Sequence, residues 1–144
     1  MKFYEYLKIL MIGMISIAFP FGFAEANEKL SMQEESQENH PPQFLYKVLS
    51  MEDWKASLSQ NQLKLPKSDA EFIHLSTEDQ LDRIIQKYYA DVPEYIVIKI
   101  ETEKLPGKLV YEANPRGTNK YYHLYHGGIP KSAIVDSKLS KVHS

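Results

Sequence analysis

The chain has 144 residues, a hydrophobic content of 43% and a formal net charge of −2 at pH 7. These values are typical of one globular domain, and the slight negative charge gives no reason to expect bulk nucleic acid as a partner. The absence of cysteine excludes disulfides, thiolate nucleophiles and cysteine-ligated metal sites.

The first 26 residues have the pattern of a secretory signal peptide. A weakly basic start precedes an apolar run that ends near Ala24, and "AEA" at 24–26 supplies the small residues that a signal peptidase requires. This run is shorter than the roughly 20 residues of a membrane span, and Pro20 and Gly22 interrupt it. We therefore expect export to the periplasm or the medium, with membrane contact only during export.

Residues 27–43 carry four glutamates, one lysine and few apolar side chains. Such a segment buries too little surface to offset the entropy of ordering it, so we expect a disordered linker. The folded domain is expected over 44–136, with a tail over 137–144 that shows no usable pattern.

The domain is expected to start with a strand over 44–50, rich in aromatic and branched residues. Ser50 then has the place of a helix N-cap, with an acidic residue three positions later. The helix is predicted over 51–60, with Trp54 and Leu58 on its buried face because they lie four residues apart.

A second strand is predicted at "EFIHL", residues 71–75, followed at once by a second helix. Ser76 is expected to be its N-cap and Asp79 to complete a capping box. Apolar residues then recur at helical spacing from 81 to 89.

Four short strands are predicted in the rest of the domain. The run over 94–100 is almost continuously apolar, which indicates a central strand covered on both faces. The others are expected over 108–112, 121–125 and 132–136, separated by turns rich in glycine, proline and asparagine. The order predicts an α+β domain, with two helices packed on a mainly antiparallel twisted sheet.

Several motifs together resemble one known family. "YKVLS" at 46–50, "FIHLSTEDQ" at 72–80, "YEANPRG" at 111–117 and "HLY" at 123–125 follow in the order and spacing of the Domain of Unknown Function 952 family. The resemblance covers about 44–136 and implies a small ADP-ribosyltransferase-like fold. "HLS" also resembles the strand-to-helix motif of tRNA 2′-phosphotransferases, which share that fold and use NAD.

The candidate catalytic residues are His74 and His123. His74 ends a strand just before a helix start, where backbone N–H groups converge and suit a phosphate or ribose. His123 is predicted to share one strand face with Tyr121 and Tyr125, which could stack on a nicotinamide or adenine ring. An imidazole exchanges its proton near neutral pH, so either ring suits acid–base catalysis.

The candidate cofactor-binding residues are Tyr46, Lys47, Ser76 and Tyr125. The resemblance implies that Tyr46 and Lys47 occupy the place where ADP-ribosyltransferases carry a ribose-binding residue. No metal site is expected, because the histidines and acidic residues have no closely spaced ligand pair. A surface ion pair is expected between Glu112 and Arg116.

Three interpretations remain open at this point. The first is an exported monomeric enzyme that binds NAD, ADP-ribose or a 2′-phosphorylated group in a cleft lined by Tyr46, His74 and His123. The second is a non-catalytic module that recognises a nucleotide, sugar phosphate or peptide end, and the third is a domain with no ligand. The chain has no Gly-x-Ser-x-Gly, GxGxxG or GKS pattern, which excludes the α/β-hydrolase, Rossmann and P-loop interpretations.

Overall fold

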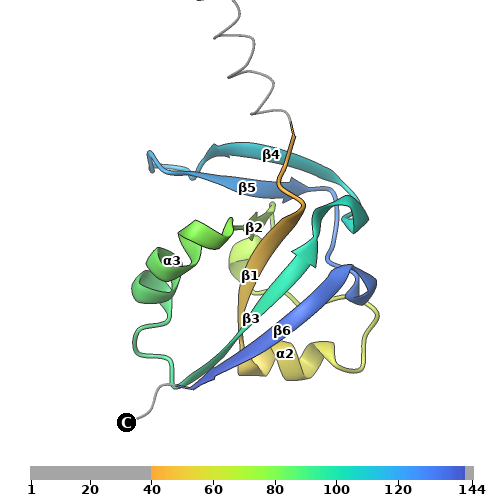
Figure 1. Cartoon of the computed structure of the whole chain (residues 1–144), viewed down its shortest axis with the longest axis vertical. Coiled ribbons are helices and arrows are strands. Elements are labelled where there is room, and N and C mark those ends of the chain that lie inside the picture. The colour runs from red at the N-terminus through yellow and green to blue at the C-terminus, as the bar shows by residue number, and fades with distance from the viewer. Residues whose placement is uncertain (1–39, 142–144) are drawn as a thin grey trace, which may run out of the picture. The chain divides into compact units, whose positions relative to one another are not determined.

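The computed structural model describes residues 40–141. The expected signal peptide, the expected linker as far as residue 39 and the last three residues lie outside this part of the chain. The helices and strands follow in the order β1, α2, β2, α3, β3, β4, β5 and β6 (Figure 1). The α+β class and the predicted order of elements are therefore confirmed.

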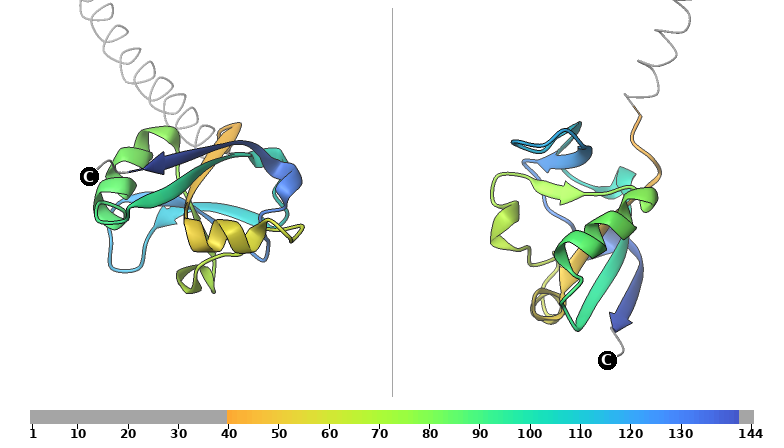
Figure 2. Two further views of the ribbon diagram at one scale, coloured as in Figure 1. Left: turned by 90° about the horizontal axis from the view of Figure 1, so that it is seen from below. Right: turned by 90° about the vertical axis from the view of Figure 1, so that its left-hand side faces the viewer.

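The strands form two antiparallel sheets of three strands each, with the orders β1-β3-β6 and β2-β5-β4 (Figures 1 and 2). Their bounds are Phe44–Ser50 for β1, Ile73–Leu75 for β2, Glu94–Glu101 for β3, Lys108–Ala113 for β4, Lys120–Tyr125 for β5 and Ile134–Lys141 for β6. The two sheets join where Tyr46 of β1 forms a bridge with Ser76, just after β2.

Helix α2 (Met51–Ser57) starts as predicted and ends earlier. Ser50 is its N-cap, and its hydroxyl accepts a hydrogen bond from the Asp53 N–H at 3.2 Å. The buried Ser57 hydroxyl accepts from the Lys64 N–H at 2.8 Å, which turns the chain away from the helix axis. Leu58 is consequently 57% exposed, so its predicted place on the buried face is wrong.

Helix α3 (Leu81–Tyr88) follows a 3₁₀ turn, η2 (Glu78–Gln80), and its predicted capping is wrong by one residue. The N-cap is Thr77 rather than Ser76, and the Thr77 N–H donates to Gln80 Oε1 at 3.1 Å. Ser76 stays extended because its N–H and C=O both pair with the backbone of Tyr46, at 3.0 and 2.8 Å. Strand pairing therefore takes precedence over the local capping motif.

One hydrophobic core connects both sheets and α2, and Trp54 packs against it as predicted. Strand β3 is central in its sheet, but only one face is fully covered beyond residue 96, because Val97 and Lys99 are half-buried. The largest fully buried apolar side chains of the core are Leu45, Leu49, Leu75, Ile98, Ile100, Leu124 and Ile129.

The last strand, β6, corrects the prediction of a patternless tail after residue 136. It begins at Ile134 and continues to Lys141, paired along β3 from Ile100 to Glu94. Most of its side chains are exposed, so it has no apolar alternation that a sequence pattern could detect. Backbone pairing with the central strand β3 and packing of Ile134 against the core hold it in place.

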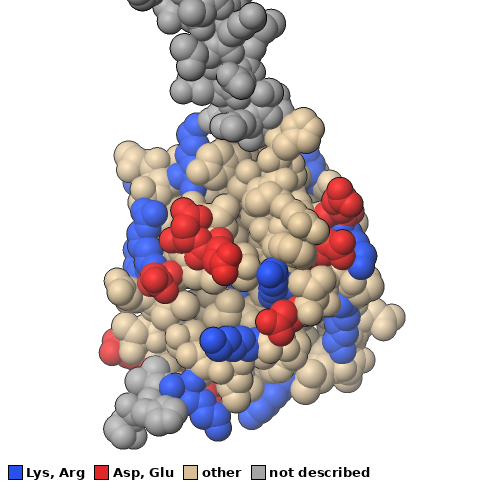
Figure 3. Space-filling model, viewed as in Figure 1, with Lys and Arg blue, Asp and Glu red and all other residues tan. Residues whose placement is uncertain are grey.

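Acidic and basic side chains are interspersed over the face shown in Figure 3. Acidic residues also gather at the first turns of η2 and α3, where Glu78, Asp79 and Asp82 face the positive end of the helix dipole. Within residues 40–141, no helix is long and apolar enough to cross a membrane.

Candidate functional site

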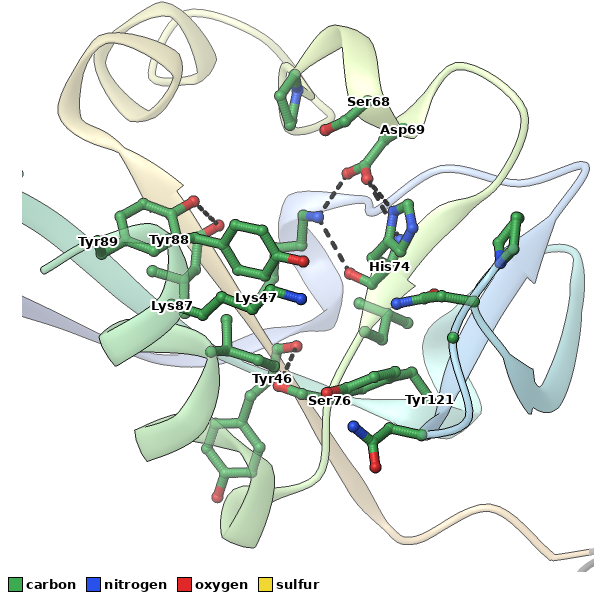
Figure 4. Close-up of a pocket in the computed structure, with 18 of the residues that line it drawn as sticks. Tyr46, Lys47, Ser68, Asp69, His74, Ser76, Lys87, Tyr88, Tyr89 and Tyr121 are labelled. Carbon is green, nitrogen blue, oxygen red and sulfur yellow. Dashed lines mark hydrogen bonds and ion pairs between the residues drawn. The ribbon is translucent and has the colours of Figure 1, made fainter.

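A cavity of about 560 Å³ opens where β1 and β2 diverge from the bridge between Tyr46 and Ser76 (Figure 4). Its walls come from β1, the 3₁₀ turn η1 (Lys67–Asp69), β2, α3 and the loop between β4 and β5. Four of the predicted site residues line it, namely Tyr46, Lys47, His74 and Ser76. They come from the two strand edges that separate there.

Inside this cavity, Asp69 joins Lys47 to His74 (Figure 4). Its Oδ1 atom lies 2.8 Å from His74 Nδ1 and 3.4 Å from the His74 backbone N, and its Oδ2 atom lies 2.5 Å from Lys47 Nζ. Lys47 Nζ also donates to the His74 C=O at 3.0 Å. The Lys47–Asp69 ion pair thus provides hydrogen-bond partners for the backbone N–H and C=O of His74 at the edge of β2, as a neighbouring strand would.

The charges of this network decide which ring nitrogen of His74 points its hydrogen at Asp69. Burial by itself would raise the pKa of Asp69, but the His74 hydrogen bond and the Lys47 charge hold that pKa below its ordinary value. Burial lowers the pKa of Lys47, and the Asp69 charge opposes that shift. Because an ionised carboxylate only accepts hydrogen bonds, His74 Nδ1 carries a hydrogen directed at Asp69, which leaves Nε2 as the ring nitrogen outside this hydrogen bond.

The Nε2 atom of His74 is accessible to a ligand in the cavity. The side chain is 37% exposed and lines the cavity, and no hydrogen bond within the described part of the chain occupies Nε2. A carboxylate that fixes the tautomer and orientation of an imidazole is the arrangement found behind general bases.

His123 lies beside His74, as the strand register requires. The two residues are directly opposite each other on β2 and β5, and their ring centroids are 5.2 Å apart. However, His123 is 0% exposed and does not line the cavity, because the ring of Phe72 stacks on it at 4.1 Å.

Both ring nitrogens of His123 are engaged. Nδ1 lies 2.9 Å from Glu112 Oε1, and Nε2 lies 2.8 Å from the side-chain amide of Asn114. Burial lowers the pKa of His123, and the hydrogen bond to Glu112 opposes that shift. A direct catalytic role for His123 stays a prediction, and its surroundings favour a role in holding Asn114 at the cavity wall.

Tyr125 lies outside the cavity, unlike the other predicted cofactor-binding residues. Its hydroxyl donates a short hydrogen bond to Glu112, and its ring lies 5.2 Å from that of Phe72. Its neighbour on the same strand face, Tyr121, does line the cavity. The ion pair predicted between Glu112 and Arg116 is wrong, because Glu112 bonds to His123 and Tyr125 instead.

Three charged residues of the cavity had no predicted role in a site: Asp69, Lys87 and Arg116. Asp69 follows a proline in a polar loop, and no sequence pattern links it to His74. Neither Lys87 nor Arg116 forms an ion pair with a described carboxylate, whereas Lys47 is neutralised by Asp69. The lining therefore has two basic side chains, Lys87 and Arg116, beyond the Lys47–Asp69 pair, which is a surplus of two positive charges.

The described residues contain no group of three or more histidine, aspartate or glutamate side chains that could hold a metal ion. The lining instead combines cations, an oriented imidazole and tyrosines from β1, α3 and β5. Cations with aromatic rings are the side chains that recognise phosphate and planar groups.

Comparison with known proteins places the chain in a family. A family model described as protein of unknown function (DUF952) matches residues 48–137, which include the candidate histidines His74 and His123 and the β4–β5 loop. The chain belongs to this family. The match starts just after Tyr46 and Lys47, so these two cavity residues lie outside it.

Solved structures of one other protein share the fold of this chain. The crystal structure of protein CC0527 from Caulobacter crescentus is similar with a TM-score of 0.61 and 25% identity, over 70% of this chain and 89% of that one. Its solution NMR structure gives a TM-score of 0.61 and 27% identity, over 72% and 89%. No curated protein matches the chain.

Proposed function

We propose that the cavity binds a phosphorylated ribose, such as that of ADP-ribose or NAD, and that His74 transfers a proton to or from it. The observation that carries this proposal is the surplus of two positive charges around an oriented imidazole, in a chain whose net charge is −2. A local excess of cations in a concave site attracts an anionic ligand against the average charge of the protein.

Each part of the lining has a role in this proposal. Lys87 and Arg116 contact phosphate oxygens, and Tyr88 and Tyr121 provide flat surfaces for a base or nicotinamide ring. With NAD as ligand, His74 Nε2 accepts a proton from a water that attacks C1′ of the nicotinamide ribose; the new C–O bond replaces the C–N bond, and nicotinamide leaves as the neutral base. Asp69 then stabilises the imidazolium through the hydrogen bond at Nδ1.

The proposal extends to the fold and the compartment. We take the two antiparallel sheets, with a cavity where they separate, to be a small version of the ADP-ribosyltransferase fold. The "HLS" motif supports this view, because His74 lines the cavity on β2, the strand that precedes η2 and α3. Residues 1–26 are proposed to direct export, so the ligand would be met outside the cytoplasm.

Calorimetry of the full chain with ADP-ribose, NAD and adenosine tests the binding step. We expect measurable heat for the two phosphorylated ligands and much weaker binding of adenosine, which lacks the phosphate. No heat for any phosphorylated ribose would refute the proposal.

The His74→Gln variant tests the catalytic step. Glutamine keeps polar contact with the ligand but cannot transfer the proton, so affinity should stay within about threefold while turnover of NAD falls by about a hundredfold or more. His126→Asn serves as the matched control, because His126 is exposed and does not line the cavity. If the wild type binds ligand but shows no turnover, the chain is a binding module and the catalytic half of the proposal fails.

A further inference from the structure

Arg116 has a backbone conformation that arginine rarely adopts, with φ at 66°. The Gly117 N–H donates to the Asn114 C=O at 2.8 Å, which closes a four-residue turn with Pro115 second and Arg116 third. Proline holds a negative φ, so a positive φ at the third position makes this a type II turn. Glycine or asparagine normally occupies that position, because a larger side chain is strained there.

The strained position coincides with the wall of the cavity. All four residues of the turn line the cavity, and Gly117, which would relieve the strain, stands one position later with an ordinary φ. The turn is held at its first residue, because the Asn114 side chain contacts the buried His123 at 2.8 Å. Arginine therefore occupies the strained position although a glycine is adjacent.

The charge environment indicates what the side chain does. Arg116 has no carboxylate partner among residues 40–141, and it is exposed at the cavity wall. The second unneutralised cation, Lys87, comes from α3, on the opposite side of the cavity from the β4–β5 loop (Figure 4). An anionic ligand in the cavity therefore has both cations in its lining.

From this geometry we infer that Arg116 is a specificity-determining residue, which selects phosphorylated over unphosphorylated ligands by a bidentate contact to a phosphate group. The inference rests on the proposed function and adds the residue that recognises the anion. The guanidinium has a planar fork that matches two phosphate oxygens, which a lysine ammonium cannot do. Strain that persists at a site wall is consistent with a functional position.

Arg116→Asn tests this inference because stability and binding should change in opposite directions. Asparagine tolerates a positive φ, so the melting temperature of the full chain should rise by about 4 °C. Its affinity for ADP-ribose should fall by about tenfold or more, the effect of losing a charge-assisted hydrogen bond, with adenosine binding unchanged. Arg116→Lys keeps the charge and the strain, so it should restore part of the affinity without raising the melting temperature.

Lys138→Gln is the control for simple loss of charge, because Lys138 is exposed on β6 and does not line the cavity. It should leave ADP-ribose affinity unchanged. Wild-type affinity in Arg116→Asn would overturn the inference about Arg116 and leave the proposed function intact. A lower melting temperature in that variant would also overturn it, since the arginine would then serve stability. Absence of ADP-ribose binding by the wild type would overturn both.

Discussion

Replacement of Asp69 by asparagine should strongly destabilise the fold, because it leaves a lysine ammonium buried without a counter-charge. The side chains of Asp69 and Lys47 are only 1% and 7% exposed, so water screens their interaction little. Removing one partner of a buried ion pair costs about 3–5 kcal/mol. We therefore expect the free energy of unfolding to fall by about 3 kcal/mol.

Unfolding of the full chain in urea measures this change through the fluorescence of Trp54, the only tryptophan, which packs against the core. With a slope of about 1–1.5 kcal/mol per molar urea, the midpoint should move down by about 2–3 M. The double variant Lys47→Met with Asp69→Asn removes both charges, and the His74 C=O loses its Lys47 donor while an amide oxygen at 69 can still accept from the His74 N–H. It should therefore be more stable than Asp69→Asn alone.

The pH dependence of Asp69→Asn provides an independent check. Without the carboxylate, burial lowers the pKa of Lys47 further, so the folded state binds fewer protons than the unfolded state below the ordinary lysine pKa. Stability of the variant should then rise from about pH 8 to about pH 10. A midpoint shift below about 0.5 M, or a double variant no more stable than the single one, would refute this reasoning.

Two further predictions concern a buried ring and a tight loop. Burial lowers the pKa of His123 below its ordinary value of 6.5, so the unfolded chain binds more protons and stability should decline as the pH falls below 6.5. In urea unfolding at several pH values, His123→Gln should reduce the dependence of stability on pH, and His126→Asn should keep it. An equal dependence in the wild type and both variants would contradict the prediction. Gly127→Ala should lower stability by about 1–3 kcal/mol, because its Cβ would lie 1.9 Å from the Pro106 carbonyl oxygen. Gly117→Ala, whose Cβ would have its nearest contact at 3.4 Å, should be nearly neutral. Thermal melts of both variants measure the difference, and similar losses in the two would argue against a steric cause.

The order and most bounds of the elements could be predicted because they depend on neighbours a few residues apart. The cap formed by Ser50 and the strand over 44–50 match the structure, since a capping hydrogen bond and a run of β-forming residues are local features. The errors occur where a tertiary contact competes with a local signal. Ser76 pairs with Tyr46, 30 residues away, and so cannot cap the following helix.

The sequence by itself determined only the candidates for chemistry, namely a small number of histidines in a chain without cysteine, one of them at a predicted strand-to-helix junction. The proximity of His74 and His123 required the register of β2 against β5, which only strand pairing across the fold decides. The tertiary structure also gives the two rings different surroundings: His74 lines the cavity, whereas Phe72 stacks on His123. Burial, ion pairing and the placement of Asp69 and Arg116 depend on distances in space, so no spacing along the chain could reveal them.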